Sequence, residues 1–205
     1  YLAGGAVNNG GIVVEWFLKS LGKVEAEYSS NTGINPYKLI DRMAASSPPG
    51  ANGLVALPFL LGGERFPIRN PDAKALFYGV QFRHKNNDFL RALLEGVIFT
   101  LKSVFDALKE KGLNAKAAYI GGSGATISTW QQIIADVFEL PILRQDAVEA
   151  TLLGDYISYS EAHGLTPELP EPKVVATPSE ANIRIYKENY TLFEKLIKLF
   201  YTKTP

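Results

Sequence analysis

The feature that most constrains this chain is a short apolar run that ends in a cluster of glycines and is followed by a helical pattern. Residues 117–120 are the apolar run, Gly121, Gly122, Ser123, Gly124 and Ala125 form the turn, and residues 127–138 have helical spacing. Glycine permits positive φ angles and lets a ligand approach the backbone without meeting a Cβ atom. The first turn of a helix offers N–H groups without intrahelical partners. The sequence therefore predicts a strand–turn–helix unit suited to a nucleotide, and a simple tight connection is the alternative.

The glycine pattern differs from two familiar nucleotide motifs. Ile127 stands where the dinucleotide pattern G-x-G-x-x-G has its third glycine, and the P-loop pattern G-x-x-x-x-G-K-[ST] does not occur. Asn8, Asn9, Gly10 and Gly11 repeat the arrangement before another helical pattern, where ordinary helix capping is the alternative. Two such turns favour a ligand that carries phosphate, held beyond the carboxyl ends of strands.

Composition excludes several classes of function. Lys and Arg total 21 and Asp and Glu total 21, so the zero net charge gives no reason to expect binding to nucleic acid or to an anionic membrane. The chain has no cysteine, which excludes disulfides, thiolate zinc sites and a cysteine nucleophile. This is compatible with a reducing compartment, and we expect a cytoplasmic protein. No apolar stretch is long enough to span a bilayer, and His84 and His163 have no visible catalytic partner.

Strands that alternate with helices predict one α/β layered domain over residues 1–205. Strands are expected at 1–7, 54–61, 117–120 and 141–143. Helices are expected at about 9–21, 36–45, 88–111, 127–138, 150–163 and from 180 onward, the first capped by Asn8 or Asn9. The small residues of 150–163 predict close packing. Residues 25–33, 62–72 and 165–178 are expected to be loops.

Other residues have two readings each. Glu64 and Arg65 follow a glycine pair in a loop, which indicates either a solvated ion pair or a loop held rigid at a domain interface or ligand edge. Gly96 lies in the longest expected helix, where glycine costs about 1 kcal/mol relative to alanine, so we expect a close helix contact there. Asp136, Asp146 and Asp155 are each able to bind Mg²⁺, but isolated aspartates are more often surface or capping residues.

Three collinear segments resemble the FGGY family of carbohydrate kinases. Residues 57–67 (LPFLLGGERFP) are similar to its P-x-L-x-G-E-R-x-P stretch, residues 75–95 to its second signature, and residues 121–136 to its G-G-G-A…W-x-Q-x-x-A-D nucleotide segment. Leu93 and Ser123 depart from the usual residues, the first on an apolar face and the second without blocking close approach. Residues 4–13 with Trp16 most resemble gluconate kinases. The order and spacing of these segments over nearly the whole chain make the resemblance specific.

The resemblance implies the second, ATP-binding domain of a two-domain kinase with the actin-like, ribonuclease-H-like fold, a mixed sheet flanked by helices. It implies that the turn contacts adenosine and that the earlier glycine pair approaches the phosphates of Mg²⁺-bound ATP. The implied cofactor-binding residues are Gly10, Gly11, Gly122, Ser123, Gly124, Ala125 and Ser128. The family's general base is an aspartate expected upstream of Tyr1, so we expect no catalytic residue here and no activity from this chain alone.

The expected partners follow from the same resemblance. The sugar or sugar acid, with gluconate as the leading acceptor, is held chiefly by an N-terminal domain of the same protein. The chain starts inside an expected strand, and we expect it to lack that domain and the start of its own domain. Xylulose, ribulose or glycerol kinase is an alternative, as is a nucleotide-sensing actin-like domain without kinase activity. The long apolar helices are compatible with a homodimer.

Overall fold

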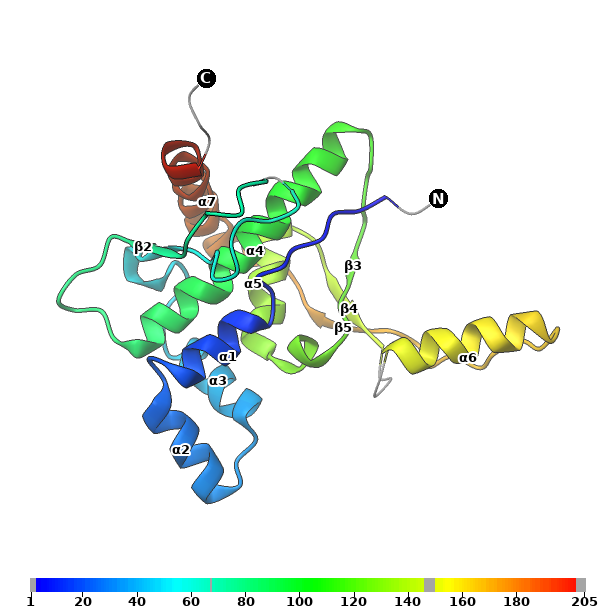
Figure 1. The fold of residues 1–205 in the computed structure, drawn as a ribbon. Helices are drawn as coiled ribbons and strands as arrows, with labels where there is room; N and C mark the ends of the chain where they lie inside the picture. The colour runs from blue at the N-terminus through cyan, green and yellow to red at the C-terminus, as the bar shows by residue number, and fades with distance from the viewer. Residues whose placement is uncertain (1–2, 67, 146–149, 202–205) are drawn as a thin grey trace.

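The computed structural model describes residues 3–66, 68–145 and 150–201 (Figure 1). The helices are α1 (Ile12–Lys19), α2 (Lys23–Thr32), α3 (Pro36–Ala45), α4 (Asn86–Glu110), α5 (Ser128–Phe138), α6 (Ala150–Ala162) and α7 (Glu180–Tyr201), with 3-10 turns η1 (Ala51–Gly53) and η2 (Ser123–Thr126). The strands are β1 (Val55–Leu57), β2 (Leu76–Tyr78), β3 (Ala118–Tyr119), β4 (Ile142–Arg144) and β5 (Lys173–Ala176). In the described chain no helix is both long and apolar enough to cross a membrane.

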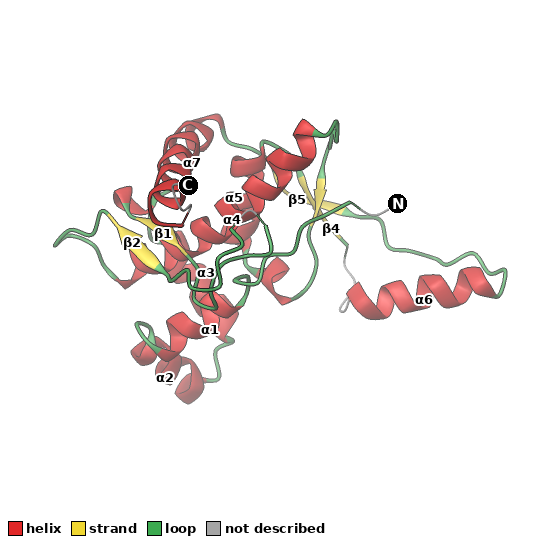
Figure 2. Cartoon of the chain, turned by 45° about the horizontal axis from the view of Figure 1, so that its top comes forward, coloured by secondary structure: helices red, strands yellow, loops and turns green. Residues whose placement is uncertain are grey.

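The strands form two small sheets at opposite sides of the helices (Figure 2). β1 and β2 pair antiparallel, with Ala56 opposite Phe77. In the other sheet β3 lies parallel to β4, and β4 lies antiparallel to β5. The structure is therefore a mixed α/β domain, as the alternating sequence pattern predicts.

Helix α4 is the centre of the core. Every residue from Leu90 to Thr100 is buried, as expected for a helix surrounded by other elements. Helices α1, α3, α5 and α7 and strand β1 all pack against it. The long helix predicted from residue 88 to about 111 is thereby confirmed, with its start at Asn86.

A buried ion pair within α4 is hydrogen-bonded to α7. Arg91 Nε lies 2.8 Å from Glu95 Oε1, and Arg91 Nη2 donates to the hydroxyl of Tyr186, 2.5 Å away. Burial raises the pKa of Glu95, and the neighbouring Arg91 guanidinium acts against that rise. Because removing one partner would leave the other charge buried and uncompensated, this pair is part of the scaffold that fixes α7 on α4.

Gly96 permits a close contact, but its neighbour is a strand and not the expected helix. A Cβ atom at Gly96 would lie 2.4 Å from the carbonyl oxygen of Ala56 in β1. Real Cβ atoms do not approach an oxygen so closely, so only glycine lets α4 lie directly against the backbone of β1. The local helix penalty of glycine is offset by this packing.

Several elements predicted from the sequence differ from those in the described residues. Residues 3–7 form no strand, residues 23–32 form helix α2 where a loop was expected, and β5 lies inside the expected loop 165–178. Strand β1 has three residues, because the chain leaves the sheet at Pro58, and a proline has no N–H to donate to a sheet. The N-terminal segment packs instead on α4, since a Cβ at Gly5 would lie 2.7 Å from Cγ1 of Val104.

Helix α6 is the largest departure from the sequence prediction. Its small residues predict close packing, but α6 extends away from the body of the molecule in both views (Figures 1 and 2). Gly154 has no atom within 4 Å of its Cβ position. Gly154 therefore does not make room for another helix in the described chain.

Candidate nucleotide site

The first glycine pair lies directly before α1 and is open. Gly11 is the residue before the helix, and no side chain caps the helix start. A Cβ atom at Gly10 or at Gly11 would meet no atom within 4 Å. The start of α1 therefore combines N–H groups that lack a side-chain partner, the positive end of the helix dipole and free space beside the backbone, the three properties of an anion-binding helix start.

The sequence predicts Asn8 or Asn9 as the cap of α1, but Asn9 does not cap the helix. It anchors this turn to a distant loop instead. Its side chain is fully buried. Asn9 Nδ2 donates to the carbonyl oxygen of Gly62 (3.0 Å) and to Glu64 Oε1 (2.8 Å), and its Oδ1 accepts from the amide of Leu61 (2.9 Å). Both N–H donors and the carbonyl oxygen of this amide side chain are thus used to hold the two segments together.

Glu64 completes this anchor. It is 2% exposed and accepts hydrogen bonds from the amide of Asn8 and, at 3.1 Å, from the amide of Asn9. The expected solvated Glu64–Arg65 ion pair is therefore wrong, because Glu64 ties its loop to the turn at Asn8 and Asn9. A position of this loop at a domain interface or ligand edge stays a prediction. The turn that precedes the open glycines is held at both of its residues.

The loop beside this turn is compact and carries positive charge. A Cβ atom at Gly63 would lie 2.5 Å from the carbonyl oxygen of Asn70, so the loop closes on itself where only glycine fits. A cleft of about 410 Å³ lies between Asn8 and this loop, and Arg65 and Arg69 line it. Guanidinium groups bind phosphate and carboxylate well, so this cleft adds cationic side chains close to the start of α1.

The second glycine turn is open at Gly122 but not at Gly124. Gly122 has a φ of +79° and no atom within 4 Å of its Cβ position. A Cβ atom at Gly124 would lie 3.1 Å from the ring of Trp130, so this glycine makes room for the tryptophan. Ala125 is buried, and its carbonyl oxygen accepts from Gln131 Nε2 (2.5 Å) and Arg144 Nη1 (3.3 Å). The turn is fixed from behind and presents Gly121 and Gly122 to solvent.

The start of α5 is not bare, contrary to the sequence expectation. Asp41 of α3 accepts from the amides of Ser128 (3.2 Å) and Thr129 (2.8 Å) and from Ser128 Oγ (2.5 Å). Partial burial disfavours the Asp41 carboxylate, but these hydrogen bonds outweigh it and hold the pKa of Asp41 below its ordinary value. The positive end of α5 is therefore already neutralised by a carboxylate of the protein.

The described residues do not build a magnesium site. Asp136 is buried, and its carboxylate accepts from Gln132 Nε2, the amide of Ser179 and Asn182 Nδ2, each at 2.8 Å. Asp155 is exposed on α6, and Asp146 lies outside the described residues. No group of three potential metal ligands forms in the described ranges. Asp136 and Asp155, the two of these aspartates that are described, therefore do not form a metal site together.

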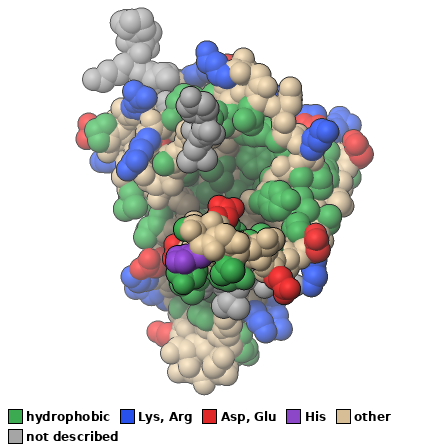
Figure 3. Space-filling model, turned by 90° about the vertical axis from the view of Figure 1, so that its right-hand side faces the viewer, with side chains coloured by type: hydrophobic (Ala, Val, Ile, Leu, Met, Phe, Trp, Pro, Cys, Tyr) green, Lys and Arg blue, Asp and Glu red, His purple; other side chains and the backbone are tan. Residues whose placement is uncertain are grey.

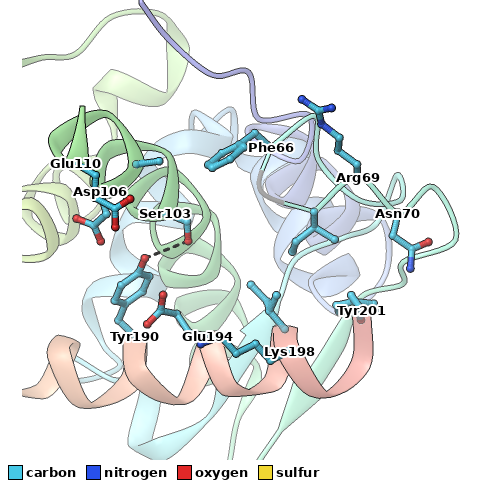
Figure 4. Close-up of a pocket in the computed structure, with 13 residues that line it drawn as sticks. Phe66, Arg69, Asn70, Ser103, Asp106, Glu110, Tyr190, Glu194, Lys198 and Tyr201 are labelled. Atoms are coloured by element: carbon cyan, nitrogen blue, oxygen red, sulfur yellow. Dashed lines mark hydrogen bonds between the residues drawn. The ribbon is translucent and has the colours of Figure 1, made fainter. Parts of the chain in front are cut away.

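A second cleft, of about 430 Å³, lies between α4, α7 and the loop that contains Arg69, which also lines the first cleft (Figure 4). Asp106 and Glu194 lie on one wall beside Tyr190, whose hydroxyl is 3.1 Å from Ser103 Oγ. Burial raises the pKa of Tyr190. None of the predicted nucleotide residues lines this cleft, whose charged residues are Asp106, Glu110 and Glu194 together with Arg69 and Lys198.

Comparison with known proteins decides the family. A sequence model of the C-terminal domain of the FGGY family of carbohydrate kinases matches residues 1–158. This chain belongs to the FGGY family. A gluconokinase of Bacillus licheniformis is 40% identical over 156 residues, which cover 75% of this chain and 30% of that protein. A xylulose kinase of Bacillus subtilis is 30% identical over 164 residues, which cover 77% of this chain and 32% of that protein.

A solved structure shares the fold. The gluconate kinase of Lactobacillus acidophilus superposes with a TM-score of 0.81 at 25% identity and covers 97% of this chain and 40% of its own. The FGGY chain therefore has the actin-like fold of these kinases, as the resemblance implied. It spans about 30% of the length of the curated relatives that it matches.

The sequence did not indicate Asp41, and it indicated the wrong role for Asn9. Nothing marks Asp41 as the partner of Ser128, from which 87 positions separate it. The role of Asn9 was misassigned as a cap, although Glu64, its partner, was singled out. A glycine pattern indicates where the backbone has space for a ligand. It does not show which backbone amides already donate a hydrogen bond to a side chain from a distant part of the sequence.

Proposed function

We propose that this chain supplies the ATP-binding part of a sugar-acid kinase and that gluconate is the acceptor. The open start of α1, with Arg65 and Arg69 in the adjoining cleft, is the observation that carries the proposal. The identity to a gluconokinase, 40%, exceeds the identity to a xylulose kinase, 30%, and supports the choice of acceptor. The sugar-binding domain, a general base upstream of Tyr1, a homodimer and a cytoplasmic location stay predictions.

The electrostatics of the two turns support one orientation of the nucleotide. At α5 the Asp41 carboxylate occupies the amides, so a phosphate there would meet a negative charge. At α1 no side chain caps the helix, so a phosphate meets N–H groups and a positive dipole. The triphosphate therefore belongs at Gly10 and Gly11, and the uncharged nucleoside at Gly121 to Ala125. The amide and hydroxyl of Ser128, which the sequence predicts as a nucleotide contact, both donate to Asp41 instead.

In this proposal the chain contributes positioning and charge stabilisation. Phosphoryl transfer needs the donor phosphate held in line and its developing charge stabilised. The amides at the start of α1 would hold the phosphates, while the Asn9–Glu64 anchor keeps those amides in place. Mg²⁺ typically rests on phosphates and water with few protein ligands, so in this proposal the metal is carried by the nucleotide. Proton removal from the acceptor hydroxyl falls to a group outside this chain.

The variant Gly11→Asp tests the phosphate site. Gly11 has ordinary helical angles and space for a side chain, and an acid at a helix start is stabilising. The variant should therefore keep or raise the melting temperature, whereas its affinity for Mg·ATP, measured by isothermal titration, should fall at least about tenfold because the carboxylate repels phosphate. Gly4→Asp is the matched control, since Gly4 also has no atom within 4 Å of its Cβ position. Equal affinity in both variants would remove the assignment.

The acceptor is tested separately with the longer polypeptide. ATP consumption should be fastest with gluconate among gluconate, xylulose, ribulose and glycerol. A preference for xylulose would favour the second candidate, which the 30% identity to a xylulose kinase supports. ATP binding without consumption for any acceptor would favour a nucleotide-sensing domain.

A further inference from the structure

The loop that closes on itself at Gly63 carries two guanidinium groups. Arg65 and Arg69 are both exposed, and neither forms an ion pair with a carboxylate of the described chain. Arg69 Nε donates to the carbonyl oxygen of Arg65 (3.1 Å), which leaves the two terminal nitrogens of Arg69 available. A guanidinium group binds a carboxylate or a phosphate through two parallel hydrogen bonds. The loop therefore presents two available cations to the cleft of about 410 Å³ that they line, and we call this the arginine cleft.

The acid in this cleft does not neutralise the two arginines. Among the described residues that line the arginine cleft, Glu64 alone is acidic. Its carboxylate accepts from the amides of Asn8 and Asn9 and from the Asn9 side chain. The lining thus has two guanidinium groups against one carboxylate, and that carboxylate is already hydrogen-bonded. The arginine cleft is therefore suited to an anion.

Two other hollows of the described chain are less suited to an anion. The second cleft contains three carboxylates besides Arg69 and Lys198. In Figure 4 the Arg69 side chain extends from its loop away from the labelled acidic residues of that cleft. The recess beside the end of α6 is lined mainly by hydrophobic side chains, and Lys and Arg lie around it and not within it (Figure 3). Arg69 therefore belongs functionally with the arginine cleft.

The reaction of the proposed function brings two kinds of oxyanion to this part of the molecule. The nucleotide carries phosphates, for which the open start of α1 provides amides. Gluconate carries a carboxylate at one end and a primary hydroxyl at the other. Glu64 ties the loop of the arginine cleft to Asn8 and Asn9, directly before the proposed phosphate site. An acid held by the two arginines would therefore lie next to the phosphates, and a cleft of this volume has room for a small ligand.

We propose that Arg69, with Arg65 beside it, binds the carboxylate of the acceptor and so makes the enzyme selective for a sugar acid over an uncharged sugar. This inference rests on the proposed function. Arg65 lies in the stretch that resembles the FGGY family as a whole, and the relatives in that family include a xylulose kinase, whose named sugar is uncharged. Arg69 lies two residues beyond that stretch. The selectivity is therefore assigned to Arg69, and Arg65 positions it through its carbonyl oxygen.

The acceptor selectivity of the longer polypeptide tests this assignment. Gluconate is compared with gluconamide, in which an uncharged amide replaces the carboxylate, by kcat/KM at saturating Mg·ATP. The wild type should prefer gluconate. Arg69→Gln should lower that preference at least about tenfold, mainly through a higher KM for gluconate, because hydrogen bonds between two charged groups are lost. Both acceptors are measured with the same variant, so a loss of folded protein leaves the ratio unchanged.

Arg83→Gln is the matched control. Arg83 is also exposed and also donates to a backbone carbonyl oxygen, that of Asn52 (3.0 Å), but it lines neither cleft. This variant should keep the preference of the wild type. An equal fall in Arg83→Gln and Arg69→Gln contradicts the inference.

The KM for Mg·ATP separates the acceptor from the nucleotide as the source of the oxyanion. It should change by less than about twofold in Arg69→Gln. A rise of about tenfold, with the preference for gluconate unchanged, would place a phosphate at Arg69 and overturn the inference.

The remaining outcomes separate this inference from the proposed function. If gluconate is phosphorylated but the wild type uses gluconamide equally well, or Arg69→Gln keeps the full preference, only this inference is overturned. If gluconate is not phosphorylated, the choice of acceptor in the proposed function is wrong, and the inference falls with it.

Discussion

At the scale of single residues, the site depends on side chains that hold backbone in place and do not themselves face a ligand. Asn9 and Glu64 fix the turn before α1, and Asp41 fixes the start of α5. These groups are polar, and Asn9 and Glu64 are buried, so each must be fully hydrogen-bonded to be stable. They hold the backbone next to each of the two exposed glycine turns by hydrogen bonds.

Asp41→Ala should lower the free energy of unfolding by about 1–2 kcal/mol, because the amides of Ser128 and Thr129 lose their capping carboxylate. The pKa of Asp41 is lowered from the ordinary value of 3.8 in the folded protein. Its contribution is therefore fully present above that value and is lost as the pH falls through the lower, folded pKa. Urea unfolding at neutral pH and below pH 4 should show the difference between wild type and variant shrinking in acid.

Asp72→Ala is the control, since Asp72 is exposed and caps no helix. It should leave the free energy of unfolding nearly unchanged at both pH values. A difference for Asp41→Ala that persists undiminished in acid would show that its carboxylate charge is not what caps α5.

At the scale of elements, the sequence predicts those whose signals are local. The long apolar pattern of α4 and the Asn35–Pro36 start of α3 are visible directly, and Asn35 does cap α3 through the amide of Tyr37. Helix α2 is missed because it is polar and buries only Ser29, so no apolar stripe marks it. Short strands such as β2 depend on a partner elsewhere in the chain, and a single-sequence pattern does not contain that partner.

Gly96→Ala tests the contact between α4 and β1. Alanine is the better helix former by about 1 kcal/mol, but its Cβ would overlap the Ala56 carbonyl oxygen. We therefore expect a net loss of about 1–3 kcal/mol in the free energy of unfolding, as for other overpacked cores, measured by urea denaturation.

Gly154→Ala is the matched control within a helix. Gly154 lies inside α6 and has open space at its Cβ position, so alanine should be neutral or stabilising by up to about 1 kcal/mol. If both variants gain stability, the close approach of α4 to β1 is not as described.

At the scale of the whole molecule, the proposed function gives the chain one side of a reaction cleft. Kinases of this kind need a closed site that excludes water from the phosphate. We therefore predict that the 205-residue chain alone does not phosphorylate gluconate in a coupled ADP assay, whereas the polypeptide with its preceding residues does. Turnover by the purified chain would show that the catalytic base lies within it.

The most direct test of the account is a crystal structure of the longer polypeptide with a non-hydrolysable ATP analogue. We predict phosphate oxygens within hydrogen-bonding distance of the amides at the start of α1, beside Gly10 and Gly11, and the nucleoside against the turn from Gly121 to Ala125. An analogue bound elsewhere, for example in the cleft between α4 and α7 (Figure 4), with both glycine turns empty, would contradict it.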